Sequence, residues 1–235
     1  MKKKILIFSP TFNERNNVLK FLNIFKLNYL KYDLLLIDDN SPDNTFLILK
    51  LNSKNNKNII IKKRQSKLGL NTAYKYAFNY AKKNKYEYLI SIDFDMQHDL
   101  NDIKKIIIHL KNNNFVIGSR YMPGGRCQLK GLRYILSYYG NKIIKKVLNI
   151  KLHEFTTAFR GYDKKVINFL DNTNIASKGY SFQTEVVYKI YRNNFKIKEF
   201  PIKFKNRSLG LSKIPKIESL RTIIFLIKTL FNNYK

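Results

Sequence analysis

Short apolar runs alternate with segments of helical spacing through the first half of the chain. Strands are predicted at five such runs, over Ile5 to Phe8, Leu34 to Ile37, Ile59 to Ile61, Tyr88 to Ile92 and Phe115 to Ile117. Between them, apolar residues recur every three or four positions, which predicts helices over Val18 to Leu30, Asn71 to Lys83 and Asp102 to Lys111. Strands that alternate with helices predict an α/β fold with a mainly parallel central sheet.

The pattern changes after Gly118, where a loop rich in proline and glycine interrupts it. Helices are predicted from about Leu132 to Leu148 and from Phe182 to Arg192. Two short strands follow, Lys196 to Phe200 and Ile202 to Lys205. The second half of the chain is therefore expected to be an elaboration that closes the site.

The last apolar stretch, Ile217 to Phe231, carries its apolar residues on one side and predicts an amphipathic helix. Such a helix fits either packing against the core or lying on anionic lipid, and both interpretations stay open. No linker or internal repeat divides the chain, so one domain is predicted over residues 1–235.

The chain is strongly basic, with 45 Lys and Arg residues against 16 Asp and Glu and a formal charge of +29. This charge predicts attraction to phosphate-rich partners, such as nucleic acid, anionic lipid or nucleotides. A nucleic-acid binder would gather basic and aromatic side chains along one groove. Here these residues are dispersed, and acidic clusters follow the strands, so nucleic acid is not expected as a partner.

Other features restrict the cellular setting. No run of about 18 apolar residues occurs, and the basic start of the chain lacks the apolar core of an export signal. The single cysteine, Cys127, excludes an internal disulfide and is compatible with a reducing cytoplasm. We therefore expect a cytoplasmic protein whose contact with a membrane, if any, is peripheral.

Three polar clusters, Pro10 to Arg15, Asp38 to Asp43 and Asp93 to Asp99, each follow a predicted strand. Ligands of α/β sheets bind beyond the carboxyl ends of the strands, so these clusters are expected to converge on one site. An acidic residue after the second strand, for which we select Asp39, is expected to bind a nucleotide base or ribose. The segment Lys67 to Thr72 lacks the glycine spacing of a dinucleotide fingerprint or a P-loop, which disfavours nicotinamide enzymes and NTPases.

The strongest local signal is Asp93 and Asp95, two carboxylates two residues apart at the end of an apolar strand. Their proximity requires a compensating charge, which a divalent cation supplies. Asp95 and Gln97 lie on the same side of an extended chain, and Mg²⁺ accepts such oxygens together with phosphate oxygens. These residues are therefore predicted to hold one metal ion.

Taken in order, seven short motifs resemble glycosyltransferase family 2, and within it the dolichyl-phosphate mannose synthase (polyprenyl-phosphate glycosyltransferase) group. They are Pro-Thr-Phe-Asn-Glu-Arg at 10–15, Ile-Asp-Asp-Asn-Ser-Pro-Asp-Asn-Thr at 37–45, Lys-Leu-Gly-Leu-Asn-Thr-Ala-Tyr at 67–74, Asp-Phe-Asp-Met-Gln-His at 93–98, Gly-Ser-Arg-Tyr at 118–121, Phe-Arg-Gly-Tyr at 159–162 and Ser-Lys-Gly-Tyr-Ser-Phe-Gln at 177–183. The resemblance covers nearly the whole chain. It implies a single glycosyltransferase-A (Rossmann-like) domain with a nucleotide-sugar half over 1–120, an acceptor-side half over 121–210 and a carboxy-terminal amphipathic helix over 211–235.

The resemblance also implies roles for individual residues. Positions that bind the donor match Pro10, Phe12, Glu14, Ile37, Asp39, Asp93, Arg207 and Lys213, the last two as a late pair over the diphosphate. The metal ligands match Asp95 and Gln97, and Asp93, Asp95 and Arg120 match the catalytic positions. The acceptor phosphate is matched to Arg120, Arg133 and Ser137.

Where the group often has glycine or a Thr-Gly-Ser run, this chain has Asn44 and the run Thr156 to Ala158. We interpret both departures as affecting the acceptor more than the donor.

The activity implied by the resemblance is transfer of a hexose, mannose from GDP-mannose in the first instance, to a polyprenyl or dolichyl phosphate, with inversion and with Mg²⁺ or Mn²⁺. An anionic phosphate acceptor needs no strong general base. The alternative acceptor is a saccharide hydroxyl in surface polysaccharide synthesis, which would require Asp93 or Asp99 to take a proton. The transmembrane helices of some relatives are missing, so peripheral attachment to the inner face of the membrane or a membrane-protein partner is expected.

Overall fold

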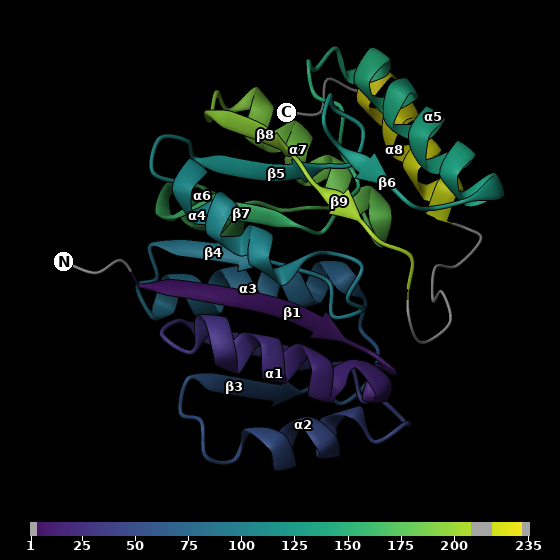
Figure 1. Cartoon of the computed structure of the whole chain (residues 1–235). Helices are drawn as coiled ribbons and strands as arrows, with labels where there is room; N and C mark the ends of the chain where they lie inside the picture. Colours follow the sequence, from purple (N-terminus) through teal and green to yellow (C-terminus); the bar gives the residue numbers. More distant parts are fainter. Residues whose placement is uncertain (1–3, 208–217, 232–235) are drawn as a thin grey trace.

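A seven-stranded sheet forms the centre of the molecule (Figure 1). The computed structural model describes residues 4–207 and 218–231. The strands are β1 (Ile5–Thr11), β2 (Asp33–Asp38), β3 (Ile59–Lys63), β4 (Tyr88–Ser91), β5 (Phe115–Ser119), β7 (Arg160–Asp163) and β8 (Ile197–Pro201), arranged in the order β3-β2-β1-β4-β7-β5-β8. All are parallel except β7, which runs antiparallel to both of its neighbours. The predicted α/β fold with a mainly parallel sheet is confirmed.

The reversed strand β7 was not predicted, because Arg160 and Gly161 give it neither an apolar run nor an alternation. Arg160 is fully buried and donates hydrogen bonds of 2.7, 2.9 and 2.7 Å to three backbone carbonyl groups. At Gly161, an added Cβ would lie 2.3 Å from the side chain of Ile106 in the helix above. The strand is therefore held by a buried cation bound to carbonyl oxygens and by a close approach that only glycine permits.

Helices cover both faces of the sheet. One face carries η1 (Arg15–Asn17), α1 (Val18–Tyr29), α2 (Thr45–Ser53), η2 (Leu100–Asp102) and α4 (Ile103–His109). The other carries α3 (Leu70–Lys83), α6 (Lys164–Asn172) and α7 (Tyr180–Arg192). The apolar residues of each face form their own buried cluster, so the sheet separates two cores.

Two further helices, α5 (Gly131–Leu148) and α8 (Glu218–Phe231), lie side by side at one end of the molecule (Figure 1). Their buried residues Ile144, Leu148, Phe225 and Leu226 belong to the core that includes α7. A small two-stranded sheet, β6 (Arg126–Cys127) with β9 (Lys203–Phe204), accompanies them. None of the helices in the described residues is long and apolar enough to cross a membrane.

Candidate functional site

The loops that follow β1, β2 and β4 leave the sheet at the same edge, because these strands are parallel neighbours. The buried Asp38 carboxylate accepts hydrogen bonds from the Thr11 hydroxyl at 3.1 Å and the Ser41 hydroxyl at 2.5 Å. The Ser41 hydroxyl accepts the backbone N–H of Asn13 at 3.0 Å. Asp38 thus fixes the first two loops against each other, a role that the sequence did not indicate.

The residue selected for base or ribose binding, Asp39, is held by an arginine that sequence reasoning missed. Asp39 forms an ion pair with Arg64, which follows β3. Arg64 also donates to the Thr72 hydroxyl and, at 3.1 Å, to the carbonyl oxygen of Gly69. Burial raises the pKa of Asp39 above its ordinary value, and the guanidinium opposes part of that rise. The carboxylate is thereby oriented by a fixed cation.

The other residues matched to the nucleotide site lie at different depths. The Phe12 ring is half-buried, with the Lys67 ammonium 4.2 Å from its centre. The Glu14 carboxylate accepts a hydrogen bond of 2.7 Å from a side-chain amide at the start of α1. Pro10 lies opposite Ile37 in the sheet register, and Ile37 is only 1% exposed. The side chain of Ile37 is therefore used for core packing.

A second cluster forms in the loop after β4, where a residue from far along the chain joins it. Nε of Arg207 lies 3.0 Å from Oδ2 of Asp95 and 3.2 Å from Oε1 of Gln97, and its Nη2 lies 2.7 Å from the same Asp95 oxygen. The Gln97 amide donates to the Lys205 carbonyl at 2.9 Å, and the Lys205 N–H donates to the Gln97 carbonyl at 2.8 Å. The predicted meeting of Asp95, Gln97 and Arg207 is thus observed.

Side-chain oxygens of Asp95 and Gln97 both contact the Arg207 guanidinium, so they form a place that accepts positive charge. Burial raises the pKa of Asp95, as does the charge of Asp93, while the Arg207 guanidinium opposes the rise. A divalent cation prefers such oxygens together with substrate phosphates, so the pair fits it. In the described part of the chain, no three His, Cys, Asp or Glu side chains gather to hold a metal, and phosphate oxygens would supply the remaining ligands.

Asp93 is the more accessible carboxylate of the pair, with a side chain 38% exposed against 6% for Asp95. Nε2 of the buried His98 lies 3.6 Å from Oδ2 of Asp93, and the His98 ring stacks on Phe159. His98 therefore supports the loop from the interior of the protein.

Arg120, matched to the phosphates, forms a buried ion pair. Its Nε and Nη2 each lie 2.7 Å from a different oxygen of Glu154, which is fully buried. Glu154 also accepts the backbone N–H groups of Thr156 and Thr157 at 3.0 and 3.1 Å. Burial alone would raise the pKa of Glu154, but Arg120 and these hydrogen bonds hold that pKa below its ordinary value. Glu154 consequently holds the Arg120 guanidinium in one orientation.

The residues matched to the acceptor phosphate lie on α5 and beside it. The Ser137 hydroxyl accepts a hydrogen bond of 2.7 Å from the Tyr121 hydroxyl, and the Tyr121 ring centre lies 5.0 Å from the Arg120 guanidinium carbon. Arg133 is exposed one helical turn before Ser137. Lys213 lies outside the described residues.

Sequence reasoning missed Arg64 and Glu154 because their partners, Asp39 and Arg120, are 25 and 34 positions away. One signal was present for Glu154. Acidic residues are scarce in this chain, 16 in 235. An acidic residue just before Phe155, in a segment without a turn motif, therefore indicates a specific partner.

Comparison with known proteins gives a family match and two curated relatives. A sequence model described as Glycosyl transferase family 2 matches residues 6–170. The chain is 30% identical over 215 residues to a polyprenol monophosphomannose synthase from Mycolicibacterium smegmatis, covering 90% of this chain and 81% of that protein. It is 29% identical over 212 residues to an undecaprenyl-phosphate mannosyltransferase from Micrococcus luteus, covering 90% and 87%.

Solved structures share the fold at low identity. A mannosyltransferase from Pyrobaculum calidifontis in complex with GDP-Man and Mn²⁺ superposes with a TM-score of 0.61 at 14% identity, over 86% of this chain and 55% of that one. Glucosyl-3-phosphoglycerate synthase from Mycobacterium tuberculosis superposes with a TM-score of 0.66 at 12% identity, over 97% and 80%. The fold is that of the glycosyltransferase-A type.

Proposed function

The chain belongs to glycosyl transferase family 2, and from this membership we propose that it transfers mannose from GDP-mannose to a polyprenyl phosphate with the help of a divalent cation. The names of the two curated relatives support this choice of sugar and acceptor. The complex of the Pyrobaculum protein supports the choice of donor and cation. Mn²⁺ and Mg²⁺ both suit the oxygen ligands of the site.

The observation that carries the proposal is the convergence of Asp95 and Gln97 on the Arg207 guanidinium. Sugar transfer leaves negative charge on the departing diphosphate, which a bound cation neutralises. Asp95 and Gln97 would hold that cation, and Arg207 together with Lys213 would bind the diphosphate. Asp39, oriented by Arg64, binds the nucleoside with Phe12 and Glu14 beside it.

The acceptor side of the site fits an anionic oxygen. Arg120, Arg133 and Ser137 bind and orient the acceptor phosphate, and Glu154 fixes the direction of Arg120. A phosphate oxygen attacks without losing a proton, so no general base is needed. Asp99 accepts the Asn101 N–H at 3.0 Å as the cap of η2, which leaves Asp93 as the carboxylate open to a hydroxyl acceptor.

The apolar surface of α5 supports peripheral contact with the inner face of a membrane. Exposed apolar side chains form a stripe along α5 at helical spacing, consisting of Leu132, Ile135, Leu136, Tyr139 and Ile143. The neighbouring α8 buries Phe225 and Leu226 and exposes Ile223, Ile224 and Ile227. Basic side chains beside this apolar surface support contact with an anionic bilayer, in which one side of α8 packs on the core and the other side contacts lipid.

The test is to incubate the purified protein with labelled GDP-mannose, Mg²⁺ or Mn²⁺ and a short polyprenyl phosphate, and to measure label extracted into organic solvent. We expect a lipid-linked mannose whose formation requires the cation. No lipid-linked label here, together with label on a saccharide acceptor supplied in a parallel reaction, would overturn the proposal in favour of a hydroxyl acceptor.

Asp95→Asn provides the first prediction. The variant removes a charged ligand and is expected to abolish turnover and weaken cation-dependent donor binding, measured by calorimetry with GDP-mannose. Asp171→Asn, which alters an ion pair between α6 and Lys82 of α3, serves as the control. Unchanged turnover in the Asp95 variant would remove that residue from the cation site.

A further inference from the structure

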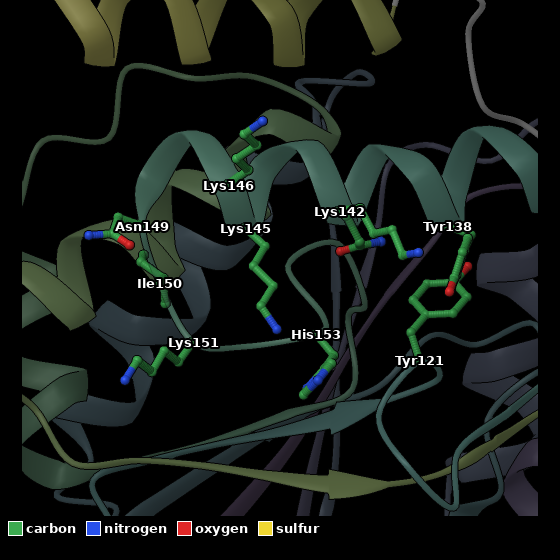
Figure 2. Close-up of a pocket in the computed structure, with 10 residues that line it drawn as sticks. Tyr121, Tyr138, Lys142, Lys145, Lys146, Asn149, Ile150, Lys151 and His153 are labelled. Atoms are coloured by element: carbon green, nitrogen blue, oxygen red, sulfur yellow. The ribbon is translucent and has the colours of Figure 1, made fainter.

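A cavity of about 550 Å³ lies under α5, on the opposite side of this helix from α8 (Figure 2). Its walls come from α5, from the segment that follows that helix and from Tyr121. Asn141 and Ile150 are only 2% and 1% exposed, so they form its inner surface. Figure 2 shows Lys145 extending from α5 toward His153. None of the residues that line the cavity belongs to the predicted cation, donor or acceptor positions. Tyr121 in its wall donates a hydrogen bond to Ser137, which was matched to the acceptor phosphate.

The lining is basic and has no carboxylate in it. Lys142, Lys145 and Lys146 come from α5, and Lys151 comes from the following segment. Among the residues that the structure describes, none of these four lysines forms an ion pair with a carboxylate. Figure 2 draws the Lys146 side chain on the other side of the α5 ribbon, so the charges that border the cavity are those of Lys142, Lys145 and Lys151. These like charges repel one another, and a bound anion would relieve that repulsion.

A carboxylate that contacts the lining is already paired. Glu199 on β8 accepts the backbone N–H of His153 at 2.9 Å, and its other oxygen lies 2.8 Å from Nδ1 of the same residue. This pairing fixes His153 in the cavity wall and removes Glu199 as a partner for the lysines. The cavity is therefore preorganised for an anion that comes from outside the chain.

The position of the cavity indicates where that anion comes from. Lys142 and Lys146 flank Ile143 on α5, so one edge of the basic lining borders the exposed apolar stripe of the helix. If the stripe contacts the acyl region of a bilayer, lysines beside it lie at the depth of the head groups. The cavity then opens toward the layer in which lipid phosphates lie.

We propose that this cavity binds the phosphodiester head group of an anionic phospholipid, with Lys145 and Lys151 as its principal cationic contacts. The proposal rests on the membrane contact of α5 and names a binding site for the bilayer lipid itself, distinct from the acceptor. Binding here would orient α5 on the membrane and turn Ser137 and Tyr121 toward a prenyl chain in the same leaflet.

The test compares binding of the full chain to vesicles of phosphatidylcholine alone and of an equimolar mixture with phosphatidylglycerol. Lys145→Gln/Lys151→Gln is expected to weaken binding to the mixed vesicles about thirtyfold, because each lysine beside an anionic surface contributes roughly a fivefold factor. Lys104→Gln/Lys111→Gln, which removes two exposed lysines in and just after α4, is the control and is expected to change binding severalfold at most. Lys145→Arg/Lys151→Arg should retain the affinity, which excludes misfolding as the cause of a loss.

Equal weakening in the pocket and control variants would overturn the proposal, since it would assign binding to the overall charge. Tight binding of inorganic phosphate in calorimetry, without any preference of the wild-type chain for the mixed vesicles, would assign the cavity to a soluble anion and would likewise overturn it. Transfer to a short, water-soluble prenyl phosphate is expected to be the same in all variants. If the wild-type chain lacks that activity, the proposed function is contradicted and the proposal for the cavity is not, since vesicle binding is measured independently.

Discussion

At the scale of single residues, the Arg207 guanidinium occupies the place that we propose for a divalent cation beside Asp95 and Gln97. The three groups are held by hydrogen bonds of 2.7 to 3.2 Å. A cation that binds these oxygens has to displace the arginine, and hydrogen bonds to charged groups contribute about 1.5–3 kcal/mol. Arg207 and the cation are therefore expected to compete before the donor arrives.

Arg207→Met is predicted to bind Mn²⁺ about tenfold more tightly than the wild-type chain when no donor is present, because no guanidinium has to leave. The variant should bind the donor diphosphate more weakly. Manganese binding is measured by electron paramagnetic resonance at mildly alkaline pH, because loss of the guanidinium raises the pKa of Asp95 further. Arg192→Met, at the exposed end of α7, is the control. Weaker Mn²⁺ binding in the Arg207 variant would show that the arginine assists the cation.

Some residues of the candidate site could be predicted from the sequence because they lie close together along the chain. Asp93, Asp95 and Gln97 occupy alternate positions of one short segment, so the sequence alone shows them as one chemical motif. Asn44 has a different explanation from the one first given: its φ is +65°, a left-handed conformation that glycine and asparagine tolerate, at the start of α2. Its identity follows from the backbone rather than from the acceptor. Arg64 could not be assigned, because only the fold brings it to Asp39.

At the scale of elements, the long periodic segments were predictable and the short ones were not. Strands β1 to β5 and helix α5 were predicted because apolar residues repeat along them at the period of the element. Strand β7 was missed because its stability comes from Arg160 and Gly161, whose partners lie in other elements. Helix α6 was missed although Asp163 caps it through a hydrogen bond to the Val166 N–H at 2.9 Å.

The close approach of β7 to α4 gives a prediction for stability. Gly161→Ala would place a methyl group 2.3 Å from Ile106 and 2.9 Å from Leu110, so the variant is expected to lose about 1–3 kcal/mol of unfolding free energy. Gly140→Ala in α5 meets no atom within 4 Å and is expected to gain about 0.5–1 kcal/mol. Urea denaturation of the two variants measures the difference. A Gly161 variant as stable as the wild type would mean that α4 shifts freely.

At the scale of the whole molecule, the charge of +29 and the apolar stripe of α5 act on different parts of membrane binding. Long-range attraction of a basic protein to anionic lipid weakens with salt, whereas burial of apolar side chains does not. Leu136→Ser/Ile143→Ser is predicted to abolish the vesicle binding that persists at high salt and to leave low-salt binding to anionic vesicles largely intact. Flotation with vesicles at two salt concentrations measures both. Leu27→Ser/Leu47→Ser, on exposed apolar residues of α1 and α2, is the control, and equal losses in the two variants would contradict the assignment of α5 to the membrane.

The reversed strand β7 has a consequence for how such enzymes can diversify. Strand β5 ends and β7 begins on the side of the sheet where β4 ends. Residues 120–159 therefore form one long connection whose two ends lie close together. The ion pair between Arg120 and Glu154 joins the beginning of this segment to a residue near its end. Evolution or a protein engineer could exchange the segment between these two residues, including α5, for one suited to another acceptor, while the sheet and the loops proposed to bind the nucleotide stay unchanged.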